Sequence, residues 1–175
     1  MRLYPPGFWP LSASVACERF GFFLLTSLLL MYLRERFALS AAQATDVLGS
    51  FVAATYLSPL VVGFATDGRM GVVRIAAVGY LVAETGYALL LADGAWPLGV
   101  GLTLIAVGAG AAKSAPQALA TRILADSPEL RDAGLTLIYL LVNVSAVVGP
   151  VGGEMVRAQL GWPAAFALSS LSLLV

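Results

Sequence analysis

The sequence predicts an all-α integral membrane protein, a bundle of six helices of which the sixth is incomplete. Three observations predict this fold class. Of the 175 residues, 59% are hydrophobic and only 11% are charged, whereas soluble domains carry about 25% charged residues. The apolar residues form long runs, and a membrane-spanning helix needs about 20 mainly apolar residues. Short polar segments separate the runs and leave no room for a second domain.

Five runs are long enough to cross a bilayer, and we expect them at about residues 8–33, 42–66, 72–91, 96–119 and 133–156. We expect the first to be a membrane helix and not a signal peptide, because it is long, contains a Glu-Arg pair and is followed by Arg34, Glu35 and Arg36. A sixth run, at about residues 163–175, is still apolar at Val175, where the sequence stops. At about 1.5 Å per residue it is too short to span, so we expect a truncated helix.

The arginines predict an orientation. The N-terminus and the connections on its side of the membrane hold five arginines, whereas the connections on the opposite side hold three. They are Arg2, Arg69, Arg74, Arg122 and Arg131 against Arg34, Arg36 and Arg157. Because basic loops stay in the cytoplasm, we expect a cytoplasmic N-terminus.

Net charge and residue usage exclude several functions. Ten basic and ten acidic residues balance, without the basic clusters that nucleic acid requires. The chain has no histidine and a single cysteine, Cys17, which excludes an internal disulfide and leaves no obvious metal site. We therefore expect no enzyme, metal or cofactor, and any coupled proton must be carried by a carboxylate.

Four charges fall inside the expected helices, at Glu18, Arg19, Glu84 and Lys113. Such charges cost several kcal/mol in a membrane and usually face a cavity or a partner. We expect Arg19 and Lys113 to line a cavity. The alternative is purely structural, with Glu18 paired to Arg19 and Lys113 paired to Glu18 or Glu84 to hold helices together.

Neutral side chains add to this cavity. Phe22 and Phe23 share the helix face of Arg19, and Tyr139 and Asn143 share a face four residues apart. Tyr56 lies three residues before Pro59. We expect the tyrosines and Asn143 to converge with Arg19 and Lys113 on one polar cleft, although Tyr56 and Asn143 could serve only as interhelical hydrogen-bond partners.

Several short motifs occur in a fixed order along the chain. They are Glu18-Arg19-Phe20; Tyr56 and Pro59, then Gly63, Asp67, Gly71 and Arg74; Gly108, Gly110 and Lys113; Arg131-Asp132-Ala133, Tyr139, Asn143 and Pro150; and Gly161-Trp162. In order and spacing they resemble the N-terminal half of the proton-dependent oligopeptide transporter family of the major facilitator superfamily. The resemblance covers essentially the whole chain and implies a six-helix bundle with a three-plus-three helix repeat.

The resemblance implies proton-coupled uptake of a di- or tripeptide across a bacterial inner membrane. Arg19 and Lys113 would bind the peptide carboxylate, and Tyr56, Tyr139 and Asn143 would complete the substrate site with Phe22 and Phe23. Glu18 would exchange protons, and Asp67 and Arg74 would belong to a gating loop. A C-terminal six-helix half, absent from this sequence, would complete the carrier.

Three positions depart from the family pattern. Val15 stands where the family has a first glutamate, and Phe22 and Phe23 stand where it has tyrosines. The missing carboxylate leads us to expect weak proton coupling, or coupling through a carboxylate outside this half.

Two other functions stay open. Gly149-Pro150-Val151-Gly152-Gly153 is one residue short of the motif of drug/proton antiporters in the same superfamily. A non-transporting membrane module would also suit Val15, Phe22 and Phe23.

Overall fold

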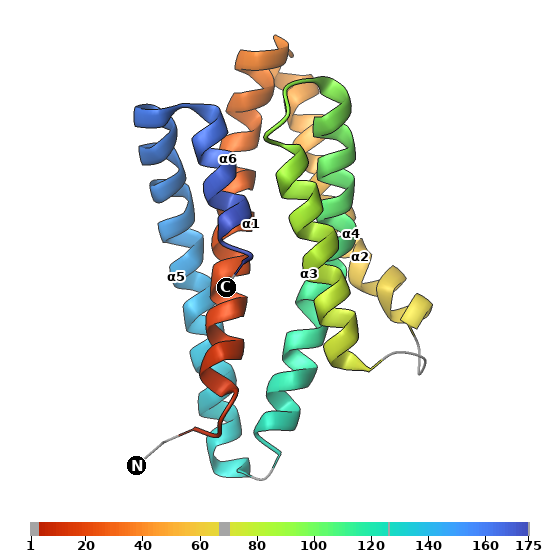
Figure 1. Ribbon diagram of the computed structural model, residues 1–175, viewed down its shortest axis with the longest axis vertical. Helices are drawn as coiled ribbons and strands as arrows, with labels where there is room; N and C mark the ends of the chain where they lie inside the picture. The colour runs from red at the N-terminus through yellow and green to blue at the C-terminus, as the bar shows by residue number, and fades with distance from the viewer. Residues whose placement is uncertain (1–3, 67–70, 126, 175) are drawn as a thin grey trace.

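The computed structural model describes residues 4–66, 71–125 and 127–174. Within them the chain forms six helices that run alternately up and down (Figure 1). They are α1 (Phe8–Phe37), α2 (Ala41–Thr66), α3 (Val72–Leu89), α4 (Ala95–Ile123), α5 (Pro128–Leu160) and α6 (Trp162–Leu171). The first five are long and apolar enough to cross a membrane. This confirms the predicted all-α membrane bundle.

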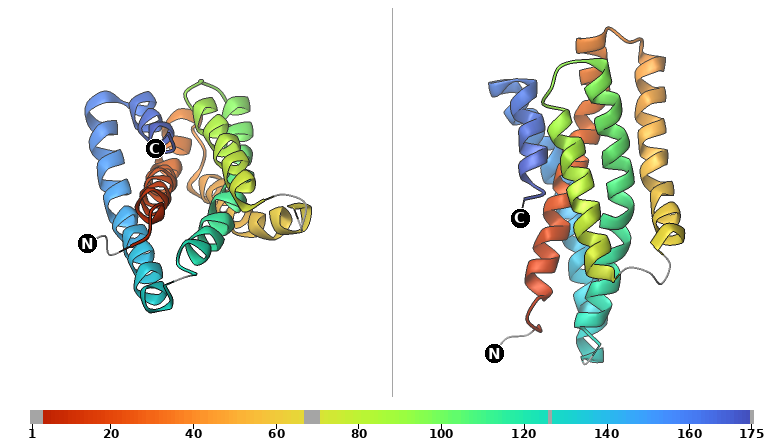
Figure 2. Two further views of the ribbon diagram at one scale, coloured as in Figure 1. Left: turned by 60° about the horizontal axis from the view of Figure 1, so that its bottom comes forward. Right: turned by 45° about the vertical axis from the view of Figure 1, so that its right-hand side comes forward.

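The helices divide into two groups of three. α1, α5 and α6 pack on one another, and α4 packs on both α2 and α3. Contacts between the groups are sparser than those of α1 with α5 and of α4 with α2 and α3. Figure 1 shows the groups on the two sides of the bundle, and Figure 2 shows α2 lying along the outer side of α4. Exchanging α1 with α4, α2 with α5 and α3 with α6 converts one group into the other. This is the pattern of the predicted three-plus-three repeat, and because α1 and α4 run in opposite directions the repeat is inverted.

The predicted helices were too short at several connections. α1 continues through Arg34 to Phe37, and α5 includes the polar segment from Pro128 and extends to Leu160. Hydropathy marks the part of a helix in hydrocarbon, about 30 Å thick, whereas the 33 residues of α5 extend about 50 Å at 1.5 Å per residue. Backbone hydrogen bonding continues in the interfacial region, where polar side chains are favourable.

Glycines allow the helices of each group to approach closely. A methyl group on Gly86 of α3 would lie 2.6 Å from the carbonyl oxygen of Gly101 on α4. Gly110 of α4 has the same role toward α2, since a methyl group there would lie 2.7 Å from the Ser58 backbone. Such contacts are typical of membrane helix pairs. The second contact matters for the site, because it brings α4 against α2 one turn before Lys113.

The packed core of the described residues has three apolar clusters. One is formed by Leu24, Leu28 and Ala165, and the charged side chains of α1 lie between the other two. The larger of these two contains Phe22, Leu25, Leu29 and neighbouring residues of α2, α3, α4 and α6. The smaller is formed by Tyr4, Phe8 and Leu124 near the opposite end. Glu18 and Arg19 are buried between these two clusters, with exposed fractions of 4% and 9%.

Candidate substrate-binding site

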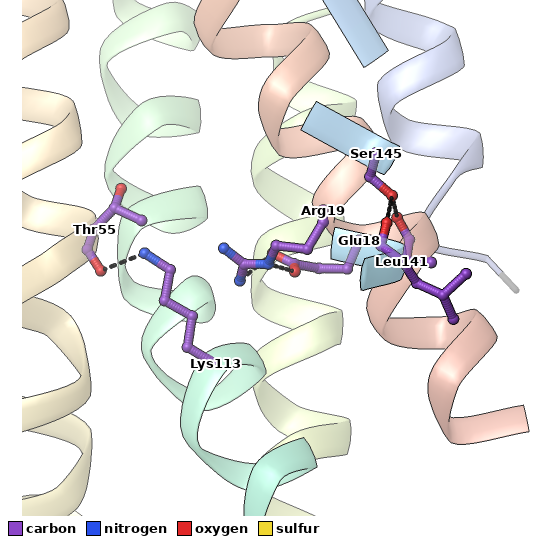
Figure 3. A network of polar contacts seen from close by, with 7 residues as sticks. Glu18, Arg19, Thr55, Lys113, Leu141 and Ser145 are labelled. Carbon is purple, nitrogen blue, oxygen red and sulfur yellow. Dashed lines mark hydrogen bonds and ion pairs between the residues drawn. The ribbon is translucent and has the colours of Figure 1, made fainter. Parts of the chain in front are cut away.

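Glu18 and Arg19 form a buried ion pair on α1. Arg19 Nε lies 2.5 Å from Glu18 Oε2, and Arg19 Nη2 donates a hydrogen bond to Glu18 Oε1 at 3.1 Å (Figure 3). Near the pair, the Ser145 hydroxyl oxygen of α5 lies 2.8 Å from the Ala16 carbonyl oxygen, a hydrogen bond that joins α5 to α1. A pair held so tightly within one helix neutralises most of its own charge.

Lys113 of α4 adds a second cation beside this pair. Its amine is partly buried and donates a hydrogen bond to the carbonyl oxygen of Thr55 on α2 at 3.3 Å (Figure 3). Among the described residues Lys113 forms no ion pair, although it interacts electrostatically with Glu18. Two cations and one carboxylate leave the cluster with one uncompensated positive charge, which favours an anionic ligand.

Aromatic rings hold the two cations. The Lys113 amine lies 4.0 Å from the ring centre of Tyr56 and 5.3 Å from that of Phe22. The Arg19 guanidinium carbon lies 5.5 Å from the same Phe22 ring. Both distances to Phe22 are within the range of cation–π attraction. Phe22 therefore contacts both positively charged side chains, with no hydroxyl group to hydrogen-bond either one.

The acceptor for Lys113 is created by a proline. Pro59 lies inside α2 and has no N–H group, so the Thr55 carbonyl four residues earlier lacks its helical donor. Ser58 Oγ donates to that carbonyl at 3.0 Å, and the Lys113 amine is the second donor. In a membrane such freed carbonyls must find new partners. The Tyr56–Pro59 segment thus supplies both a ring and a carbonyl oxygen to the lysine.

A cavity of about 710 Å³ lies between the two helix groups and is lined by residues of α1, α2, α4 and α5. Four of the predicted substrate-binding residues line it together, namely Arg19, Tyr56, Lys113 and Tyr139. Tyr56 and Tyr139 are 68% and 69% exposed, so they lie at the cavity's open side. Whether these residues bind substrate stays a prediction, but the structure places them around one space.

Three predicted substrate-binding residues do not line the cavity, namely Phe22, Phe23 and Asn143. Asn143 is exposed and does not line the cavity, because its side-chain amide donates to the Tyr139 carbonyl oxygen at 2.7 Å. A short amide on a helix readily bonds back to the carbonyl four residues earlier. Phe23 packs edge-on against Phe22 at a centroid distance of 5.8 Å and is also absent from the lining.

The predicted gating residues and the buried charge of α3 are not among the residues that line the cavity, as far as the structure describes them. Arg74 is exposed in the first turn of α3, and Asp67 is outside the described residues. Glu84 of α3 accepts a hydrogen bond of 2.5 Å from Ser170 Oγ of α6, which joins the two helix groups. In the described part of the chain Glu84 has no ion-pair partner, and its Oε2 accepts no hydrogen bond.

Sequence reasoning missed several cavity residues. Val15, Ser114, Gln117 and Thr121 all line the space around Lys113. The signal was present for two of them, because Gln117 and Thr121 follow Lys113 at steps of four on the same helix face. Across residues 4–66, 71–125 and 127–174, no three His, Cys, Asp or Glu side chains gather where they could hold a metal ion.

The family model of the Major Facilitator Superfamily matches residues 11–175. The chain belongs to this superfamily. The dipeptide and tripeptide permease A of Escherichia coli (strain K12) is 30% identical over 173 residues, which are 98% of this chain and 35% of the permease. The permease of the same name from Erwinia pyrifoliae is 32% identical over 178 residues, with the same coverage of both proteins.

Solved structures of peptide transporters have the same fold. The peptide transporter POT in complex with sulfate superposes with a TM-score of 0.91 at 22% identity, over 97% of this chain and 36% of that one. Tetrameric PepTSo2 superposes with a TM-score of 0.84 at 28% identity, over 95% and 38% of the two chains. These findings confirm the resemblance to proton-dependent oligopeptide transporters. The chain spans about a third of the length of the curated relatives it matches.

Proposed function

We propose that this chain is the N-terminal half of a proton-coupled carrier for di- and tripeptides, and that Arg19 and Lys113 bind the peptide's carboxylate. One observation carries the proposal. The cluster of Glu18, Arg19 and Lys113 has one uncompensated positive charge and borders a cavity open on one side. The dipeptide and tripeptide permeases among the relatives support a peptide as the ligand, with its terminal carboxylate as the anionic group.

The chemistry of a peptide suits this arrangement. Its terminal carboxylate can accept hydrogen bonds from an ammonium and a guanidinium at once, and charge-assisted bonds are the stronger ones. Lys113 has three N–H donors and uses one on Thr55, which leaves two for a ligand. Arg19 retains donors beyond those directed at Glu18. The substrate's ammonium group would then face the second half of the carrier.

The rest of the carrier follows from the same proposal. A second six-helix half would close the open side at Tyr56 and Tyr139, and alternating access would come from rocking of the two halves. The bundle would lie in a bacterial inner membrane with its N-terminus in the cytoplasm. Glu18 is the proton-exchanging candidate in this half, and Val15 leaves it without a second carboxylate one turn away.

Uptake by the full-length carrier in proteoliposomes tests the proposal. Wild type is expected to take up labelled dialanine, and Lys113→Gln is expected to reduce its apparent affinity about 10- to 100-fold, since bonds to charged groups contribute about 1.5–3 kcal/mol. Arg122→Gln is the matched control, because it removes an exposed cation from the same helix outside the cavity. No uptake by wild type, or equal losses in both variants, would contradict the proposal. Export of an apolar cation instead would favour an antiporter.

A further inference from the structure

The cavity-facing side of α4 carries a row of polar side chains one turn apart. Lys113, Gln117 and Thr121 follow one another at steps of four residues, and all three line the cavity. Each step advances about 6 Å along the helix and turns by about 40°, so the three side chains form one slightly slanted row. A ligand held by its carboxylate at Lys113 and extending along α4 therefore passes Gln117 next.

Gln117 differs from its neighbours in its hydrogen bonding. Ser114 Oγ already donates to the Gly110 carbonyl oxygen at 2.9 Å, and Thr121 Oγ1 donates to the Gln117 carbonyl oxygen at 3.0 Å. The carboxamide of Gln117, by contrast, is exposed and makes no hydrogen bond to any residue that the structure describes. It keeps two N–H donors and one carbonyl acceptor available to the cavity.

We infer that Gln117 recognises the peptide bond of the substrate, beside the carboxylate site at Arg19 and Lys113. The inference rests on the proposed function and specifies which group of the ligand a side chain of α4 hydrogen-bonds. A peptide bond offers one N–H donor and one C=O acceptor, and a carboxamide complements both groups. No other side chain in the row from Lys113 to Thr121 has a free donor together with a free acceptor.

The spacing suits this assignment. Helical side chains lean toward the N-terminus of their helix, so the Gln117 carboxamide extends toward the turn of Lys113. Successive Cα atoms of a peptide are about 3.8 Å apart. The peptide bond nearest the carboxylate is thus within one residue of the carboxylate itself. Gln117 lies one turn of α4 from Lys113, so a hydrogen bond from its carboxamide can reach that peptide bond while Lys113 binds the carboxylate.

This assignment predicts selection for peptides over other zwitterions. A site that hydrogen-bonds a substrate group discriminates against an analogue that lacks it, because the protein's polar group is then left unpaired. The informative pair of ligands is glycylglycine and 5-aminopentanoate. Both have an ammonium and a carboxylate joined through four chain atoms, and only the first contains an amide.

The test measures inhibition of labelled dialanine uptake by each ligand, in proteoliposomes containing the full-length carrier. Gln117→Leu keeps a side chain of similar size without the amide. We expect it to raise the inhibition constant of glycylglycine about 3- to 10-fold, the value of one net hydrogen bond, and to leave that of 5-aminopentanoate within 2-fold of wild type. Thr103→Val is the control, since Thr103 lies on α4 outside this cavity and donates to its own helix.

The outcomes are distinguishable. An equal rise for both ligands would mean that Gln117 supports the fold or contacts the second half, and it would overturn the inference. No change for glycylglycine would overturn it too, with the carboxylate site intact. If wild-type carrier takes up no dialanine, the proposed function itself fails, and this inference falls with it.

Discussion

Replacing Pro59 by alanine should weaken peptide binding without weakening the protein. The substitution returns an N–H group to α2, and that group should bond the Thr55 carbonyl oxygen four residues earlier. The carbonyl already accepts from Ser58 Oγ at 3.0 Å and from the Lys113 amine at 3.3 Å. A third donor displaces the longer bond, so Lys113 is no longer held beside Arg19.

The magnitude follows from the bond that is lost. Interhelical hydrogen bonds in membrane proteins contribute about 0.6 kcal/mol on average and at most about 1.7. The affinity for dialanine should therefore fall about 3-fold, and by no more than about 18-fold. Helix α2 itself should become no less stable, because alanine restores a backbone hydrogen bond.

Competition binding to the purified full-length carrier measures this effect, together with its thermal unfolding midpoint. Pro150→Ala is the matched control, since Pro150 lies inside α5 and does not line the cavity. A double-mutant cycle sharpens the test, because Pro59→Ala should have no further effect in a Lys113→Gln background. Unchanged or tighter binding in the single variant would refute the reasoning, as would full additivity in the cycle.

Three further predictions concern packing and coupling. Gly110→Val should destabilise the bundle by about 1–3 kcal/mol, because the valine side chain would meet the Ser58 backbone. Gly99→Ala should not destabilise it, since Gly99 has open space around it, and thermal unfolding in detergent measures both variants. Ser170→Ala should lower the stability of the bundle by about 0.6 kcal/mol and at most about 1.7, because it removes the hydrogen bond to Glu84 between α3 and α6. No loss of stability in the same unfolding assay would contradict this. An imposed proton gradient should stimulate dipeptide uptake only weakly, since Val15 removes one carboxylate; a strong stimulation abolished by Glu18→Gln would show this expectation to be wrong.

The helices could be predicted from the sequence because hydropathy reports directly on burial in hydrocarbon. The end of α1 and the start of α5 could not be predicted in this way. Arg34 to Phe37 and the polar first residues of α5 lie outside the apolar runs, but backbone hydrogen bonding continues the helices through them. The grouping of α1 with α5 and of α2 with α4 depends on which small residues face each other. Gly110 against Ser58 is one such contact, and it becomes visible only once the helices are placed.

The candidate site was partly predictable for a similar reason. Charges inside apolar runs are rare, so Arg19 and Lys113 stand out as residues that need a cavity or partner. Helical spacing also places Gln117 on the face of Lys113. Helical spacing does not reveal that the Asn143 amide hydrogen-bonds its own helix, or that Pro59 frees the carbonyl oxygen to which Lys113 donates. Those depend on side-chain rotamers and on the contact between α2 and α4.

Carboxylate recognition by Lys113 is the central claim, and one comparison of ligands tests it most directly. Inhibition constants of dialanine and of dialanine amide are measured on the full-length carrier, in wild type and in Lys113→Gln. The two ligands differ by the charge of one terminal group. We predict that wild type prefers the free acid by about 10-fold or more, and that this preference largely disappears in Lys113→Gln. Equal inhibition by acid and amide in wild type, or an undiminished preference in the variant, would contradict the account.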